Sequence, residues 1–102
     1  MTENPFDHTT FDEVIHGRLR LGVMAYLSTA GEATFADLKA QVGATDGNLS
    51  THLRKLEDAG YVRLEKAFVG RRPRTTIQLT SSGRAAWLVW LDRIRGLMNA
   101  AE

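Results

Sequence analysis

The spacing of apolar residues changes abruptly at Gly60, and this change limits the folds that the chain can adopt. Before this glycine, three leucines recur every three to four residues, as on one face of an amphipathic helix: Leu49, Leu53 and Leu56. After it, residues 61–68 and 75–80 alternate apolar and polar side chains, which is typical of half-buried strands. Residues 69–74 contain a glycine and a proline and predict a turn. A helix therefore leads directly into an antiparallel hairpin.

A shorter helix is predicted just before the leucine-bearing one. Thr34 is a good N-cap for a helix over residues 35–41. Gly43 ends that helix, and the next one begins at Thr45 or Asp46. Two short helices joined by a tight turn that contains glycine form a helix-turn-helix.

Three more helices complete the pattern. They are predicted over residues 11–16, 18–29 and 81–101. The first rests on Thr10 and Glu13, which have the spacing of a capping box. The last begins at a cap formed by Thr80 or Ser81.

Length and composition are those of one ordinary domain. The 102 residues leave room for a single self-sufficient core, and 43% of them are hydrophobic and 25% charged. The chain has no cysteine, which excludes disulfides, thiolate metal sites and cysteine nucleophiles. Neither a membrane-spanning run nor a secretory signal is evident, so we expect a cytoplasmic protein that does not contact membranes.

The net charge of +1 hides an uneven distribution. Residues 1–51 carry three basic and seven acidic side chains, whereas residues 52–76 carry seven basic and three acidic ones. One basic stretch on a nearly neutral chain suits a polyanion bound at one surface. A solvated basic loop explains the charge equally well, so charge alone leaves both interpretations open.

The order of helix, helix-turn-helix, basic hairpin and long helix resembles a winged helix. The resemblance is specific at residues 45–62, TDGNLSTHLRKLEDAGYV, which are similar to the recognition helix and following strand of MarR- and ArsR-like bacterial transcription regulators. Residues 70–75 resemble the wing of these proteins, and residues 79–86 resemble the start of their last helix. The closest similarity is to regulators that consist of little more than one winged-helix domain.

The resemblance implies a mainly α fold with a small antiparallel β-hairpin (α+β). It also implies three segments: an N-terminal arm with a short helix (1–17), a winged helix-turn-helix domain (18–80) and a C-terminal dimerisation helix (81–102). We expect a sequence-specific regulator that binds double-stranded DNA.

Recognition helices enter the major groove with their N-terminal residues toward base edges. The expected base-reading residues are Asp46, Gly47, Asn48, Ser50 and Thr51. The expected DNA-backbone contacts are Thr34, His52, Arg54 and Lys55. In the wing, Arg71, Arg72 and Arg74 are expected along the backbone or in the minor groove. Asp46 suits a helix cap better than a base contact.

The terminal helices carry more large apolar side chains than a three-helix core can bury. We therefore expect a homodimer that reads a palindromic operator, with repression by promoter occlusion as its output. The expected interface residues are Phe11, Val14, Ile15, Trp87, Trp90, Leu91, Ile94, Leu97 and Met98.

Other classes of function find less support in the sequence. His8, His16 and His52 lack the close spacing of metal ligands, and no serine has an evident base, so we expect no enzyme, metal or cofactor. A winged helix that binds only a protein partner remains the alternative. Nothing in the sequence identifies a small-molecule effector.

Overall fold

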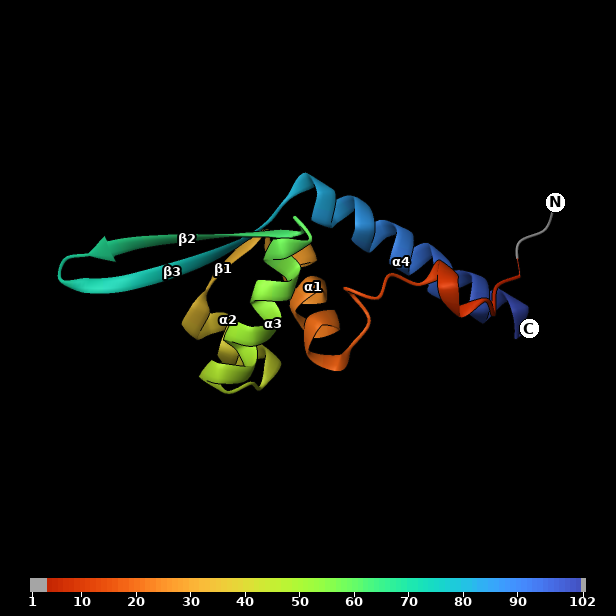
Figure 1. Ribbon diagram of the computed structural model, residues 1–102, viewed down its shortest axis with the longest axis horizontal. Coiled ribbons are helices and arrows are strands. Elements are labelled where there is room, and N and C mark those ends of the chain that lie inside the picture. The colour runs from red at the N-terminus through yellow and green to blue at the C-terminus, as the bar shows by residue number, and fades with distance from the viewer. Residues whose placement is uncertain (1–3, 102) are drawn as a thin grey trace.

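The computed structural model describes residues 4–101, so residues 1–3 and 102 of the predicted terminal segments lie outside it. Its elements follow the predicted order (Figure 1). They are the 3₁₀ helix η1 (His8–Thr10), α1 (Arg18–Ala30), β1 (Glu32–Thr34), α2 (Phe35–Val42), α3 (Asp46–Asp58), β2 (Val62–Val69), β3 (Arg72–Leu79) and α4 (Ser81–Ala100). Within residues 4–101, no helix combines the length and apolar character that a membrane crossing requires. The predicted α+β winged-helix architecture is confirmed.

Threonine hydroxyls cap three of the helices. Thr34, Thr45 and Thr80 each accept a hydrogen bond from the amide three residues further on, at 2.9 to 3.2 Å. Each bond satisfies one of the amides that the first helical turn leaves without an internal partner. The caps at Thr34 and Thr80 are as predicted, and α3 is capped by Thr45 rather than by Asp46.

The predicted helix over residues 11–16 is wrong. These residues form turns, and the short helical segment η1 lies earlier, with Asp7 as its N-cap. The Asp12 carboxylate accepts from the Val14 amide at 2.8 Å and from the Tyr61 hydroxyl. The His16 amide donates to the Asp12 carbonyl at 2.9 Å, so the segment makes a single turn that starts at Asp12 and not the helix predicted from Thr10. The hydrogen bond to Asp12, together with partial burial and the negative charge of Asp12, raises the pKa of Tyr61 to about 12.

The sheet has three antiparallel strands in the order β1-β3-β2, and β1 was not predicted. Three residues are too few to show an alternating pattern, and β1 is recognisable only by its pairing with β3. The hairpin strands extend further than predicted, so the turn between them contains Gly70 and Arg71 alone. As a result, the outer half of the hairpin projects beyond the helices (Figure 1).

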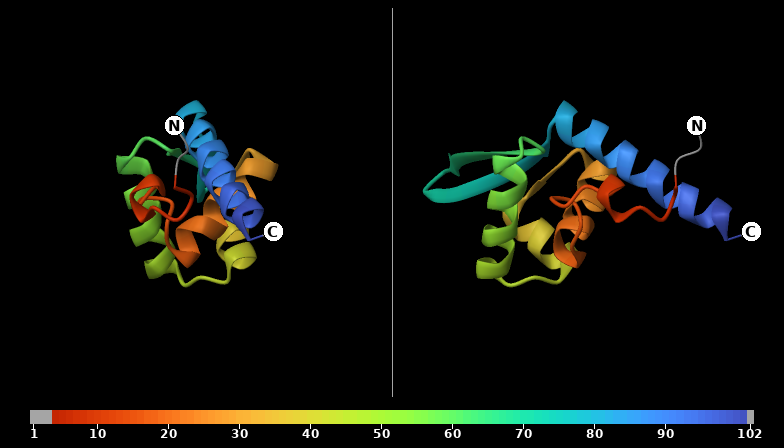
Figure 2. Two further views of the ribbon diagram at one scale, coloured as in Figure 1. Left: turned by 90° about the vertical axis from the view of Figure 1, so that its right-hand side faces the viewer. Right: turned by 45° about the vertical axis from the view of Figure 1, so that its right-hand side comes forward.

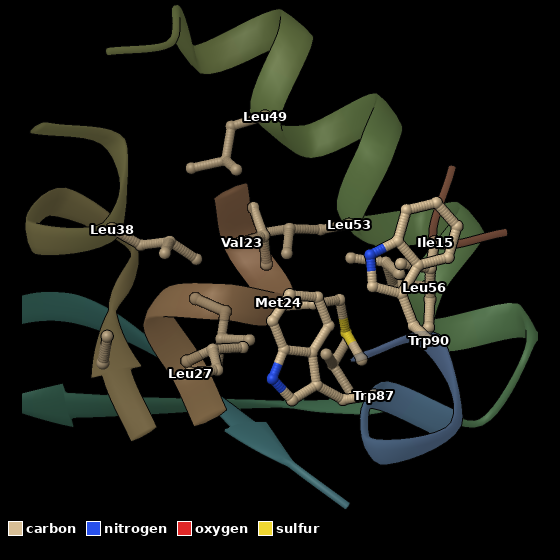
Figure 3. Packing of buried hydrophobic residues seen from close by; sticks show 13 residues of the cluster. Ile15, Val23, Met24, Leu27, Leu38, Leu49, Leu53, Leu56, Trp87 and Trp90 are labelled. Carbon is tan, nitrogen blue, oxygen red and sulfur yellow. The ribbon is translucent and has the colours of Figure 1, made fainter. Parts of the chain in front are cut away.

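The core lies where α1, α2, α3 and the inner half of the sheet meet. Figure 3 shows the buried side chains that converge there. Fully buried members include Val23, Met24, Leu27, Leu38, Leu49, Leu53, Leu56 and Ile77. The predicted leucine stripe of α3 is therefore confirmed as its packing face.

The far part of α4 leaves this domain and is covered by the N-terminal segment, residues 4–16 (Figure 2). The molecule is consequently elongated, 57 × 24 × 21 Å. Ile15 is fully buried, and Trp87 and Trp90 are 8% and 7% exposed, within a single chain. The Phe11 ring meets Trp90 edge-on at 5.5 Å. These three side chains are therefore covered without a second copy, and a role for them in a homodimer interface stays a prediction.

Gly83 is the point where α4 packs most closely on the domain. A Cβ placed there would lie 2.1 Å from the carbonyl oxygen of Tyr61 and 2.8 Å from a Leu79 methyl. We expect Gly83→Ala to lower the free energy of unfolding by about 1–3 kcal/mol through this overlap. Gly47→Ala is the control, since no atom lies within 4 Å, and alanine raises helix propensity by about 1 kcal/mol. Urea denaturation measures both, and equal stability of Gly83→Ala and the parent chain would contradict the packing described.

Candidate nucleic-acid interface

The helix α3 presents one polar face to solvent. Its leucines are fully buried on the opposite face, and their packing fixes how the helix is rotated about its axis. The exposed residues are Asp46, Gly47, Asn48, Ser50, Thr51, Arg54 and Lys55, followed in the last turn by Glu57 and Asp58. The structure therefore brings all five predicted base-reading residues and two predicted backbone contacts together on one helix, open to solvent.

Two of these residues already have partners. The Asp46 carboxylate forms an ion pair with Lys39 of α2, at 2.7 Å. The Thr51 hydroxyl donates to the Gly47 carbonyl at 2.9 Å. The ion pair offsets a negative charge that would otherwise face an incoming polyanion. Among the described residues, the Asn48 and Ser50 side chains have no hydrogen-bond partner, so both are available to a ligand.

The hairpin forms a second wall beside α3. Ser50 and Arg54 of α3 line a hollow of about 690 Å³ together with Lys66 and Thr75 of the hairpin. Arg54 and Lys66 bring positive charge to it from the two sides, and Glu57 contributes one negative charge. A concave surface with cations on both walls suits a phosphate backbone. Both walls are visible in Figure 2, where the hairpin projects beside α3.

Three of the arginines of the hairpin, Arg71, Arg72 and Arg74, are exposed near its end. Arg71 lies in the turn, whereas Arg72 and Arg74 lie on β3, where they pair with Val69 and Ala67. Successive residues of a strand point to opposite faces, so Arg72 and Arg74 lie on the face opposite Lys66.

Arg72 and Arg74 also border a second hollow, of about 640 Å³, beside the start of α2. Thr34, the predicted backbone contact on that side, is partly buried and lines the same hollow. Of the predicted wing residues, Arg72 and Arg74 thus border the same hollow as Thr34 and do not line the hollow that faces α3.

Sequence reasoning missed two basic residues of this surface. Arg18 lies beside the N-terminal end of α3, where it borders a hollow with Thr45 and Asn48. Lys66 follows Leu64 by two residues and therefore continues the inner face of its strand. That alternation was a signal for Lys66, whereas nothing local in the sequence places Arg18 next to a helix thirty residues away.

His52 is held by a neighbouring helix. The Arg20 guanidinium of α1 donates to its Nδ1 at 3.0 Å. Because arginine is always a donor, Nδ1 must be the acceptor, and the neutral ring then carries its proton on Nε2. Partial burial and the charges of Arg20 and Lys55 lower the pKa of His52, which favours this neutral form. In the described part of the chain, Nε2 is neither bonded internally nor fully buried, so it offers solvent an N–H donor.

A polar recognition surface and a basic hairpin beside it are the working parts of a winged helix. A family model described as a winged helix DNA-binding domain matches residues 19–98. The chain belongs to this family. In winged-helix terms α3 is the recognition helix, and the outer hairpin, residues 66–74, is the wing.

Three proteins from different organisms show what this winged-helix protein is similar to. An uncharacterized protein of Methanocaldococcus jannaschii is 32% identical over 90 residues, which cover 88% of this chain and 98% of that protein. A transcriptional regulator homologue from Pyrococcus horikoshii OT3 is 26% identical, with a TM-score of 0.87 and coverage of 96% and 97% of the two chains. A protein assigned to the MarR family of transcriptional regulators, from Enterococcus faecalis V583, is 25% identical, with a TM-score of 0.70 and coverage of 99% and 87%. The predicted similarity to MarR-like regulators is confirmed.

Partial burial of His52, together with the charges of Arg20 and Lys55 beside it, makes the stability depend on pH. The pKa of His52 is below 6.5 in the folded winged helix and about 6.5 in the unfolded chain. The unfolded chain therefore takes up a proton first as pH falls, and the free energy of unfolding decreases from pH 6.5 downward.

We expect His52→Gln, which keeps an oxygen acceptor for Arg20, to lose less stability than the parent chain between about pH 7.5 and pH 5.5. Urea denaturation across this range measures the difference. Parallel stability curves for the two proteins would show that His52 is not perturbed as described.

Proposed function

We propose that this winged-helix protein is a homodimeric transcriptional repressor that reads a palindromic operator in double-stranded DNA. The comparisons support a DNA-binding transcriptional regulator. The observation that carries the finer proposal is the exposed polar face of α3 with a cationic hairpin beside it. In this arrangement Asn48 and Ser50 read base edges, while Arg54 and Lys55 contact phosphates one turn further on.

The second copy is proposed to bind along α4. Three exposed apolar side chains lie on the part of α4 that the chain itself leaves open: Leu88, Val89 and Met98, at 59%, 54% and 59% exposure. Leu88, Leu91 and Met98 are spaced to share one stripe of the helix. Three half-buried residues of α4 remain predicted interface residues: Leu91, Ile94 and Leu97. The other predicted interface residues pack within the single chain: Phe11, Val14, Ile15, Trp87 and Trp90. A twofold axis at this surface presents two recognition helices to successive major grooves, about 34–36 Å apart.

Selection of bound duplexes from a random pool is the experiment that tests this function. A palindromic consensus with two half-sites about one helical turn apart is the expected result. The alternative, a winged helix that binds only a protein partner, predicts no retention of any duplex even at low salt. Loss of transcription from a promoter that overlaps the consensus distinguishes repression from activation.

Replacement of Arg72 by alanine tests the wing. We expect Arg72→Ala to weaken binding to every duplex and to flatten the salt dependence by about one unit of slope, because one phosphate contact is lost. Arg84→Ala removes the same charge from an exposed arginine at the start of α4 and should leave both quantities unchanged. A loss confined to one base position would instead make Arg72 a base-reading residue.

A charge on the open stripe of α4 tests the homodimer. We expect Leu88→Asp to produce monomers, because a carboxylate buried between two apolar surfaces without a partner is strongly unfavourable. Val69→Asp places the same charge on an equally open apolar residue of the wing and should leave the dimer intact. Sedimentation equilibrium measures both, and an unchanged dimer for Leu88→Asp would exclude this surface as the interface.

A further inference from the structure

The wing ends in an apolar side chain that its basic character does not explain. Phe68 is 75% exposed, the highest value among the large apolar residues that the structure describes, and Val69 beside it is 54% exposed. Exposing a phenylalanine side chain to water is unfavourable, and a loop that contacts only solvent can carry a polar residue at this position instead. A side chain of this kind at the tip of a binding element indicates a ligand with an apolar part.

The register of the hairpin shows which way Phe68 points. Phe68 pairs with Pro73, and Lys66 pairs with Thr75 two residues further in. Pairs that alternate along a hairpin share one face of the sheet, so these four residues lie on one side. Lys66 and Thr75 line the hollow that α3 also borders. Phe68 therefore continues the side of the wing that faces the recognition helix, further out toward the tip.

The surroundings of Phe68 are strongly cationic. Residues 66–74 contain Lys66, Arg71, Arg72 and Arg74 and no acidic side chain. Lys66 lies on the same face of the hairpin as Phe68, Arg71 lies in the turn, and Arg72 and Arg74 lie on the opposite face. Phosphate alone would not need the phenyl ring, and an apolar groove of a protein would not need cations on both faces of the wing. The minor groove of DNA meets both requirements, because apolar sugar and base edges lie between two rows of phosphates.

We propose that Phe68 enters the minor groove next to the major groove that α3 occupies, and wedges against a base step while the wing cations hold the flanking phosphates. The proposal rests on the DNA-binding function proposed above. Apolar wedges partly unstack a step and bend the duplex away from the protein. Steps that unstack easily, such as TA and CA/TG, are favoured at this position although no hydrogen bond reads them. Phe68 is thereby a specificity-determining residue.

The test compares Phe68→Ala with the parent chain on the duplex obtained by selection. We expect affinity to fall about tenfold, as when a base loses an aromatic contact. The salt slope should stay the same, because no charge is removed, which separates this variant from Arg72→Ala. The bend of the bound duplex, measured by energy transfer between its labelled ends, should decrease. The preference for TA over AA at the wing position should disappear.

Two variants serve as controls. Val69→Ala removes an exposed apolar side chain from the opposite face of the same strand and should change neither bend nor preference. Phe68→Leu keeps an apolar wedge, so it should retain part of the bend and part of the TA preference that Phe68→Ala loses. Since Phe68 is 75% exposed and lies outside the core, its variants are expected to unfold at about the same temperature as the parent chain.

Each outcome decides a different point. If Phe68→Ala bends DNA and prefers TA as the parent chain does, the wedge is wrong, while binding by the parent chain and the effect of Arg72→Ala preserve the proposed function. If the parent chain binds no duplex, the proposed function and the wedge both fail. If Phe68→Ala instead abolishes sedimentation of the protein with phosphatidylglycerol vesicles and leaves duplex binding intact, the ring serves a membrane and the wedge is wrong.

Discussion

The packing of three leucines of α3 is the interaction on which the rest of this structure depends. Leu49, Leu53 and Leu56 are fully buried against the other helices and the sheet (Figure 3). A helix with only one apolar stripe has a single favourable rotation about its axis. The polar residues from position 46 to position 55 are therefore held outside by the core itself. Core packing alone therefore sets the rotation of α3 that exposes the recognition surface.

In the sheet, too, one sequence pattern determines both which side chains are buried and which are exposed. In its inner half, Leu64 and Ile77 point into the core, and in its outer half the same face carries Lys66 and Phe68 to the surface beside α3. The period of two therefore fixes two things at once: how the hairpin is anchored and which side chains its free end presents to a ligand. A slip of one residue in the register would bury polar side chains and turn Phe68 away from α3.

Sequence periodicity predicted the parts of the molecule that local rules control. The bounds of α1, α2, α3 and α4, and the caps at Thr34 and Thr80, follow from apolar spacing and capping chemistry within a few residues. The main failures involve distant partners. Where a capping box was predicted at residues 10–13, Asp12 instead bonds Val14 and, 49 positions away, Tyr61. The strand β1 exists only through β3, and Trp90 of α4 packs against Phe11 and His16 of an N-terminal segment whose path no local pattern shows.

The candidate site also combines features that local sequence patterns determine with features that depend on distant contacts. The contacts of Arg20 show why the distant ones matter. Its guanidinium holds the carbonyls of Val14 and His16, at 2.6 and 3.1 Å, as well as His52 of the recognition helix. The N-terminal segment that packs on α4 is thus joined through one side chain to α3. In the proposed homodimer, the position of each recognition helix relative to α4 sets the distance between half-sites. The Arg20 guanidinium bridges the two elements and restricts this distance more tightly than the apolar contacts around Trp90 do alone. The reason is that hydrogen bonds are directional, whereas apolar packing is not.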